Sequence, residues 1–502
     1  MSTSLIARDS SGAQSQSLLR VSVAAGMVVP AIVATVVTSP VPIDTRLEAA
    51  LLCALCLVPS WAYLRESPSR RRPIPFLPII GVLYALYFAL PAALGSYNQH
   101  YRIVLSPAWD YDDAVFVALA GWVSLLVSME MSGFLFPMSP AASRSNVPDQ
   151  RLRNYGALLM LVGLVVDAVR RLFSIPIEIA GVLVFASSLG WFGSALLVML
   201  NVRGRLSSSW RALTYAGVVG FFALAVATGS VATAAFYGTI IVVAAWIGRG
   251  RLSITWIAGI LVGGVVIVSL RGVSDQYRKI VWFQEEGGGI AQRTQLFFQL
   301  LHQRVETDGV QGAVAQGFET TAGRSANLDL LADVIRRTPS EVPYWDGTTY
   351  LSLVGAFVPR FLWPDKPTKE LGQAFGHRYG YVGVNDTGTA VNLPILVEFY
   401  LNFGLIGVVI GMAIVGLIYR LVERAVNTPG QDDILSLAGI VLMIPLTNIE
   451  SDFSLGFGGL ILNGAALWFV LRLMGRGTAP DVARDPTIPA HAMVIPVQQR
   501  SH

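Results

Sequence analysis

The chain has 502 residues, of which 53% are hydrophobic and 14% are charged, and its mean hydropathy is +0.57. These values exclude an ordinary water-soluble globular protein and indicate a polytopic membrane protein. The 36 Lys and Arg residues exceed the 32 Asp and Glu residues only slightly, which argues against nucleic acid as a partner.

Apolar runs of about 20 residues, the length that crosses a bilayer, predict about twelve membrane spans in an all-α fold. The predicted spans are 21–38, 48–64, 74–95, 113–136, 155–173, 177–200, 211–228, 230–247, 253–270, 404–421, 433–449 and 455–473. They divide the chain into a membrane domain at 21–270 with about nine spans, a long segment at 271–403, and about three further spans at 404–474. Residues 1–20 and 475–502 are predicted to be disordered tails.

Cys53 and Cys56 lie in the apolar run LLCALCLVPSW. A zinc or redox pair needs polar surroundings, so both are expected to be packed helix residues. Gly407, Gly411 and Gly416 predict close helix packing in a later span.

The basic residues of the connections set the predicted orientation. RESPSRRR (65–72), NVRGRLSSSWR (201–211) and RLVER (420–424) alternate with connections that carry almost no positive charge. Basic connections face the cytoplasm, so both termini are expected inside and residues 271–403 outside. Arg170 and Arg171 are an exception, because they fall on the outer side.

The outer segment contains two amphipathic stretches and one short apolar stretch. Residues 290–305 carry apolar side chains on one helical face, which predicts a helix that lies on the membrane surface. Residues 325–339 predict a second such helix, which stops at Pro339. The stretch NLPILVEFYLNFG (392–404) is too short to cross a bilayer; it either extends the following span or dips partway into the membrane.

Cations among aromatic residues and prolines mark FVPRFLWPDKP (357–367). Proline fixes φ and interrupts helices, so Arg360 and Lys366 are expected on a kinked, rigid platform. Guanidinium and ammonium groups near the hydrocarbon boundary suit a lipid-linked pyrophosphate. The structural alternative is that they contact lipid headgroups or pair with nearby aspartates.

Two groups of outer carboxylates are candidate bases. Glu398 lies in an apolar helix, where it could take a proton from a sugar hydroxyl, or serve as a structural ion pair or helix cap. The stretch WDYDDA (109–114) could bind a divalent ion or supply a base, but acids at this position commonly cap a helix and suit its dipole. No pair of histidines shows metal-ligand spacing, so no metal site is predicted.

The stretches YWDGTTYLSLVGAFVPRFLWPDKP and NLPILVEFYLNFGLIG resemble bacterial O-antigen polymerases, also called oligosaccharide repeat-unit polymerases. The resemblance covers less than a fifth of the chain, and a second long outer loop with an arginine-rich motif, which some polymerases have, is not found. It implies a metal-independent membrane glycosyltransferase without a cofactor, located in the bacterial inner membrane and acting at its periplasmic face.

The resemblance also assigns roles to residues. Glu398 would activate the acceptor hydroxyl, and Arg324 and Arg360 would stabilise the departing charge. Lys366, Arg271, Arg378 and Tyr400 would bind the pyrophosphate. The implied partners are an undecaprenyl-pyrophosphate-linked oligosaccharide, membrane lipid, a chain-length regulator and a flippase.

Three other functions fit the same sequence. An O-antigen ligase would use the same donor and deliver the glycan to a lipid A core. A glycosyltransferase that uses a polyprenyl-monophosphate sugar would take Asp110 or Asp112 as its base. A transporter of lipid-linked sugar or polysaccharide would place its ionisable residues near the membrane midplane.

Overall fold

The computed structural model describes residues 43–67, 70–94, 111–137, 147–173, 176–250, 290–325, 327–356, 371–387 and 389–475. It also describes Trp363 and eight separate positions between 259 and 280. The predicted span 21–38, most of the span 253–270, and both predicted tails apart from Gly475 lie outside these residues.

Eight helices of the described part are long and apolar enough to cross a membrane, which confirms the all-helical membrane prediction. Seven are single elements: α2 (Ile43–Arg65), α5 (Tyr111–Leu135), α6 (Asp149–Leu172), α7 (Ile177–Val202), α8 (Ser208–Ala227), α9 (Val231–Arg249) and α15 (Ile395–Val426). The eighth joins α17 (Phe453–Phe457) to α18 (Leu460–Gly475). In lipid a helix satisfies all of its own backbone hydrogen bonds, which is why apolar length alone locates most of these elements.

Two of the predicted spans are not single, full-length α-helices in the structure. The span 74–95 consists of α3 (Phe76–Tyr84), the π-helical turn η1 (Ala85–Ala89) and α4 (Leu90–Leu94). The span 433–449 is shortened to α16 (Asp433–Met443), followed by the 3-10 turn η4 (Pro445–Thr447). Pro445 has no backbone donor to continue the helix, so α16 covers about half of a bilayer at ~1.5 Å per residue.

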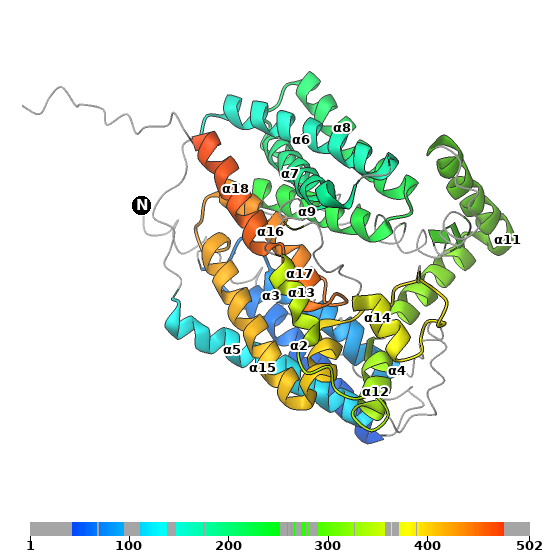
Figure 1. The fold of residues 1–502 in the computed structure, drawn as a ribbon. Coiled ribbons are helices and arrows are strands. Elements are labelled where there is room, and N and C mark those ends of the chain that lie inside the picture. The colour runs from blue at the N-terminus through cyan, green and yellow to red at the C-terminus, as the bar shows by residue number, and fades with distance from the viewer. Residues whose placement is uncertain are drawn as a thin grey trace, which may run out of the picture.

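The helices form two groups (Figure 1). Helices α6, α7, α8 and α9 pack together in one group, and α2, α3, α5 and α15 form the other, with α16 and α18 between them. Small residues permit the closest contacts. A Cβ at Gly163 of α6 would lie 2.3 Å from Gly190 Cα of α7, and one at Gly416 of α15 would lie 2.4 Å from the Leu125 carbonyl oxygen of α5.

Helices α5 and α15 run parallel, since higher residue numbers in one helix match higher numbers in the other. The hydroxyl of Ser124 donates to the Val409 carbonyl and that of Ser128 to the Ala413 carbonyl, both at 2.6 Å. Such hydroxyls join helices where no water is present.

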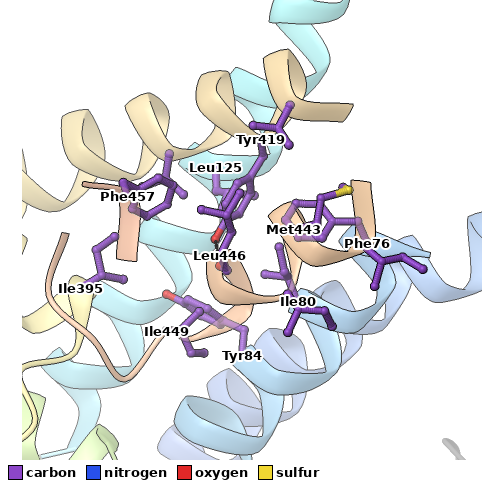
Figure 2. Close-up of a cluster of buried hydrophobic side chains, with 14 of the residues drawn as sticks. Phe76, Ile80, Tyr84, Leu125, Ile395, Tyr419, Met443, Leu446, Ile449 and Phe457 are labelled. Carbon is purple, nitrogen blue, oxygen red and sulfur yellow. Dashed lines mark hydrogen bonds between the residues drawn. The ribbon is translucent and has the colours of Figure 1, made fainter. Parts of the chain in front are cut away.

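A buried apolar cluster joins α3, α15, η4 and α17 (Figure 2). Phe76, Tyr419, Leu446 and Phe457 meet there, and the Tyr419 hydroxyl donates to the Leu446 carbonyl at 2.9 Å. The cluster fixes the position of the connection between α16 and α17 inside the protein.

Three arginines near helix ends are paired with buried carboxylates. Arg72 binds the buried Glu423 of α15, and Arg170 and Arg171 both bind Asp167 one turn earlier in α6, at 2.6 and 2.9 Å. This pairing explains how α6 carries two arginines at the end where the charge pattern predicts few.

The outer segment contributes α11 (Ile290–Ser325), α12 (Asn327–Arg337), the 3-10 turn η3 (Thr348–Tyr350), α13 (Leu351–Ala356) and α14 (Leu371–Arg378). Both predicted amphipathic helices are present. The apolar face of α11 packs, through Phe297 and Leu300, against Val273 and Tyr277. At least part of this face is therefore covered by protein, whereas the prediction placed it on the membrane surface.

Candidate functional site

Helix α15 is broken at Phe403 and Gly404. Phe403 has φ −144° and ψ 18°, and Gly404 has φ 63° and ψ −151°. The second combination is essentially restricted to glycine. The element therefore has a short arm, residues 395–402, and a long arm, residues 404–426.

The short arm folds back along the long arm. A Cβ at Gly407 would lie 2.3 Å from the Phe399 carbonyl oxygen, and a Cβ at Gly411 would lie 2.5 Å from the Phe399 ring. In a straight helix residues 399 and 411 would be about 18 Å apart. This geometry rules out a straight extension of the following span; the partway dip of residues 392–404 into the membrane stays a prediction.

Glu398 lies on the short arm and is fully buried. Its Oε2 accepts a hydrogen bond of 2.6 Å from the backbone amide of Phe453, the first residue of α17. Its Oε1 has no hydrogen-bond partner among the described residues. One oxygen thus serves as the helix cap that the sequence allows as an alternative, and the other has no partner within the described part of the chain.

A turn of the outer segment, residues 345–352, is bound to the short arm. The amide of Trp345 donates to the Leu401 carbonyl at 3.0 Å. The amide of Gly347 donates to Asn402 Oδ1 at 2.8 Å, and Asn402 Nδ2 donates to Thr349 Oγ1 at 2.9 Å. Asn402 and Thr349 are both fully buried, so these bonds form without competition from water.

Hydroxyl and aromatic side chains complete the surroundings of Glu398. The Ser352 hydroxyl donates to Ser454 Oγ at 2.6 Å, which joins the turn to α17. The Tyr350 ring lies 6.4 Å from Phe399 and 6.3 Å from Phe453. Burial, and then the negative charge of Glu398, raise the pKa of the Tyr350 hydroxyl, so Tyr350 stays protonated beside the carboxylate.

The structure brings only part of the predicted set together. Arg360, Lys366 and Arg271 lie outside the described residues, and the backbone of Arg324 lies in α11. Arg378 is engaged by protein groups. Its Nη2 donates to the Pro343 and Tyr344 carbonyls at 2.8 and 3.3 Å, and its guanidinium lies 4.7 Å from the Trp345 ring centroid.

Tyr400, Asp112 and Asp113 make no hydrogen bond to the Glu398 carboxylate, and Asp110 lies outside the described residues. Tyr400 follows Glu398 by two positions, and residues so spaced point to different sides of a helix. Asp112 and Asp113 lie in the first turn of α5, and the Thr45 hydroxyl donates to Asp112. Their position in the first turn suits the helix dipole, as the structural alternative expects.

Thr349, Asn402, Ser352 and Ser454 are part of the site but were not among the predicted residues. One signal was present, because Asn402 follows Glu398 by four positions in an apolar helix and so lies on the same face. Thr349 and Ser454 gave no comparable signal, since their contacts join segments far apart in sequence. Within the described part of the chain no group of three or more His, Cys, Asp or Glu side chains is arranged to hold a metal ion.

Comparison with known proteins identifies a family for just over half of the chain, which includes Glu398 but not Phe453 or Ser454. No curated protein and no solved structure matches the chain. A family model, described as a domain of unknown function (DUF8712), matches residues 173–428, which is just over half of the chain. The match includes α7, the outer segment, the short arm and the long arm. The chain therefore belongs to the DUF8712 family of domains of unknown function.

Proposed function

We propose that the protein is a membrane glycosyltransferase that joins undecaprenyl-pyrophosphate-linked oligosaccharide repeat units into a surface polysaccharide of the O-antigen or capsule type. In this proposal about twelve spans hold both termini in the cytoplasm. Residues 271–403 then lie at the periplasmic face of the bacterial inner membrane, where the lipid-linked substrate is presented.

The environment of Glu398 carries the proposal. An ionisable residue buried among apolar helices is costly and marks a functional site by default. One carboxylate oxygen is fixed by the Phe453 amide and the other is unpartnered among the described residues. The carboxylate is thus held in a defined orientation, while its second oxygen has no hydrogen-bond partner within the described residues that would compete for a substrate proton.

The proposed reaction balances as a single displacement. Glu398 Oε1 accepts the proton of an acceptor sugar hydroxyl, and the oxygen of that hydroxyl forms a bond to the anomeric carbon of the donor glycan. The bond from this carbon to the pyrophosphate oxygen breaks, and its electron pair leaves with undecaprenyl pyrophosphate. Glu398 then gives its proton to water. A positioned base contributes about 10²–10⁴-fold to such a rate.

Cations of the outer segment are proposed to stabilise the leaving group. Arg360 and Lys366, on the proline-rich stretch, and Arg324 of α11 would bind the pyrophosphate oxygens as negative charge develops there. Arg271 is a further candidate. Arg378 is proposed to hold the turn at residues 343–345, since its guanidinium already contacts two carbonyls and an aromatic ring.

A second candidate function, transport, is favoured by one observation. Transporters place discontinuous helices around an ionisable site near the membrane midplane. Here α15 is broken at Phe403 and Gly404, α16 stops after 11 residues, and the Glu398 side chain joins the short arm to α17. A transporter would move lipid-linked glycan without lengthening it.

The chain length of the glycan in cells tests the proposal. Glu398→Gln keeps an acceptor for the Phe453 amide, and Arg360→Ala removes one proposed cation. Each is expected to leave membrane insertion intact and to abolish polymer, with single repeat units transferred to the final acceptor. Glu341→Gln, at an exposed carboxylate of the same segment, is the control and should keep the normal ladder.

Other outcomes identify the alternatives. Full-length polymer that accumulates on the carrier lipid in the Glu398→Gln strain would indicate a ligase. Single repeat units that accumulate on the cytoplasmic side would indicate a transporter. A normal ladder in both the Glu398→Gln and Arg360→Ala strains would contradict the proposed chemistry.

A further inference from the structure

We propose that Thr349, oriented by Asn402, is a positioning residue whose hydroxyl holds Glu398 Oε1 toward the acceptor sugar hydroxyl. This inference rests on the proposed function, because it assigns a role within the same glycosyl transfer. It also assigns the outer segment a second role besides binding pyrophosphate, which is to orient the base Glu398.

The hydrogen bond that Thr349 Oγ1 accepts does not use the hydroxyl proton of this residue. Asn402 Nδ2 donates to Thr349 Oγ1 at 2.9 Å, so Asn402 uses an acceptor site of this hydroxyl and not its proton. The Thr349 hydroxyl donates to no acceptor within the described part of the chain, and it lies close enough to the Glu398 carboxylate to favour its charged form. Oε1 accepts no hydrogen bond from the described residues in the structure, and catalytic hydrogen bonds commonly tighten only when substrate is bound.

Asn402 fixes both partners of this contact. Its Nδ2 also donates to the Glu398 backbone carbonyl at 2.8 Å, and its Oδ1 accepts from the Gly347 amide. The same side chain therefore spans the short arm that carries Glu398 and the turn that carries Thr349. Gly347 has φ 82°, and a Cβ there would lie 3.1 Å from the Phe403 ring, so the turn needs glycine at this point to reach Asn402.

In this proposal the contact limits how far the Glu398 carboxylate can rotate. Oε2 is held by the Phe453 amide, so rotation of the carboxylate is limited from one side. A hydroxyl donor on Oε1 limits it from the other side, and one lone pair of Oε1 is then left for the proton of the acceptor sugar. Holding the base in this geometry accelerates the transfer without changing how tightly the donor glycan binds.

A matched pair of substitutions tests the role. Thr349→Val keeps the shape of the side chain and removes the hydroxyl, whereas Thr349→Ser keeps the hydroxyl. Each full-length variant would be purified and given undecaprenyl-pyrophosphate-linked repeat units. We expect Thr349→Val to lower kcat by roughly 10- to 100-fold, as for loss of a hydrogen bond to a charged group, with KM within about twofold. Thr349→Ser should restore at least half of the wild-type kcat. If the valine variant does not fold, Thr349→Ala replaces it with the same expectation.

The outcomes separate this inference from the function on which it rests. If wild-type protein forms polymer, Glu398→Gln does not, and Thr349→Val has the wild-type kcat, the positioning role is wrong and the function stands. Equal losses of kcat in the valine and serine variants would also overturn it, because they would show a packing defect. If wild-type protein forms no polymer, both proposals fall.

Discussion

The reversal of α15 can be tested by joining its two arms with a disulfide. A Cβ at Gly411 would lie 2.5 Å from Phe399 Cγ, and the Cβ–Cγ bond adds about 1.5 Å. The Cβ atoms of a Phe399→Cys, Gly411→Cys variant are therefore no more than about 4 Å apart, so a small shift of the arms brings them to the ~3.5–4.5 Å of a disulfide. The substitution also removes the ring that a side chain at 411 would meet. In an unbroken helix the separation would be about 18 Å.

The assay uses a background in which Cys53 and Cys56 are replaced by alanine. Mild oxidation in native membranes should close the new pair, and the peptide joining the two arms should lose two hydrogens in mass spectrometry. Phe399→Cys combined with Ile410→Cys is the control, because Ile410 is exposed and lies on a different side of the long arm. If both single-cysteine variants react with maleimide and the 399–411 pair does not close, the folded-back arm is wrong.

Three further substitutions test the break in α15 and the Arg72–Glu423 ion pair. For each variant the free energy of unfolding would be measured by denaturant titration in detergent. Gly404→Ala should cost about 1–3 kcal/mol, because φ 63° with ψ −151° strains any residue with a Cβ. Gly456→Ala should stay within about 1 kcal/mol of wild type, since a Cβ there meets nothing within 4 Å; equal costs would contradict the break in α15. Arg72→Ala should cost about 3 kcal/mol by leaving Glu423, which is 1% exposed, without its counterion. The double variant with Glu423→Gln should recover part of that loss, and no recovery would show that the pair is not coupled.

Most of the membrane helices could be predicted because the bilayer imposes one strong requirement. A spanning segment must bond its own backbone groups and present about 20 apolar residues, so α2, α5, α8 and α9 follow from the sequence. The glycines predicted to permit close packing do so, because Gly416 lies against α5, and Gly407 and Gly411 lie against Phe399. The early end of α16 could have been inferred from Pro445, but the apolar pattern around it favoured a full span.

The folding back of the short arm could not be derived from local pattern. Residues 395–426 form a nearly continuous apolar helical sequence, and Gly404 permits a reversal without requiring one. The contacts of Phe399 with Gly407 and Gly411 decide between the straight and reversed forms, and these contacts are tertiary. Of the site, Glu398 was recognisable because a carboxylate in an apolar helix is unusual. The approach of Thr349 and Ser454 to it depends on how three distant segments pack.

The basic residues of the outer segment show a different limit of prediction from sequence. The sequence places Arg360 and Lys366 on one rigid stretch, but spacing alone does not show which groups face a common substrate. Arg378 illustrates this point, since its guanidinium is bound to carbonyls of the neighbouring turn. The cationic part of the site stays a prediction, which Arg360→Ala tests.

The most direct test of the central claim is the lengthening of glycan by the purified full-length protein. Undecaprenyl-pyrophosphate-linked repeat units would be supplied in lipid vesicles without nucleotide or added metal, and glycan length and released undecaprenyl pyrophosphate would be measured together. The account predicts a ladder of longer lipid-linked glycans, one undecaprenyl pyrophosphate released for each bond formed, and a loss of about 10²–10⁴-fold in rate for Glu398→Gln. Repeat units that remain single with the wild-type protein, or lengthening at an unchanged rate in Glu398→Gln, would contradict it.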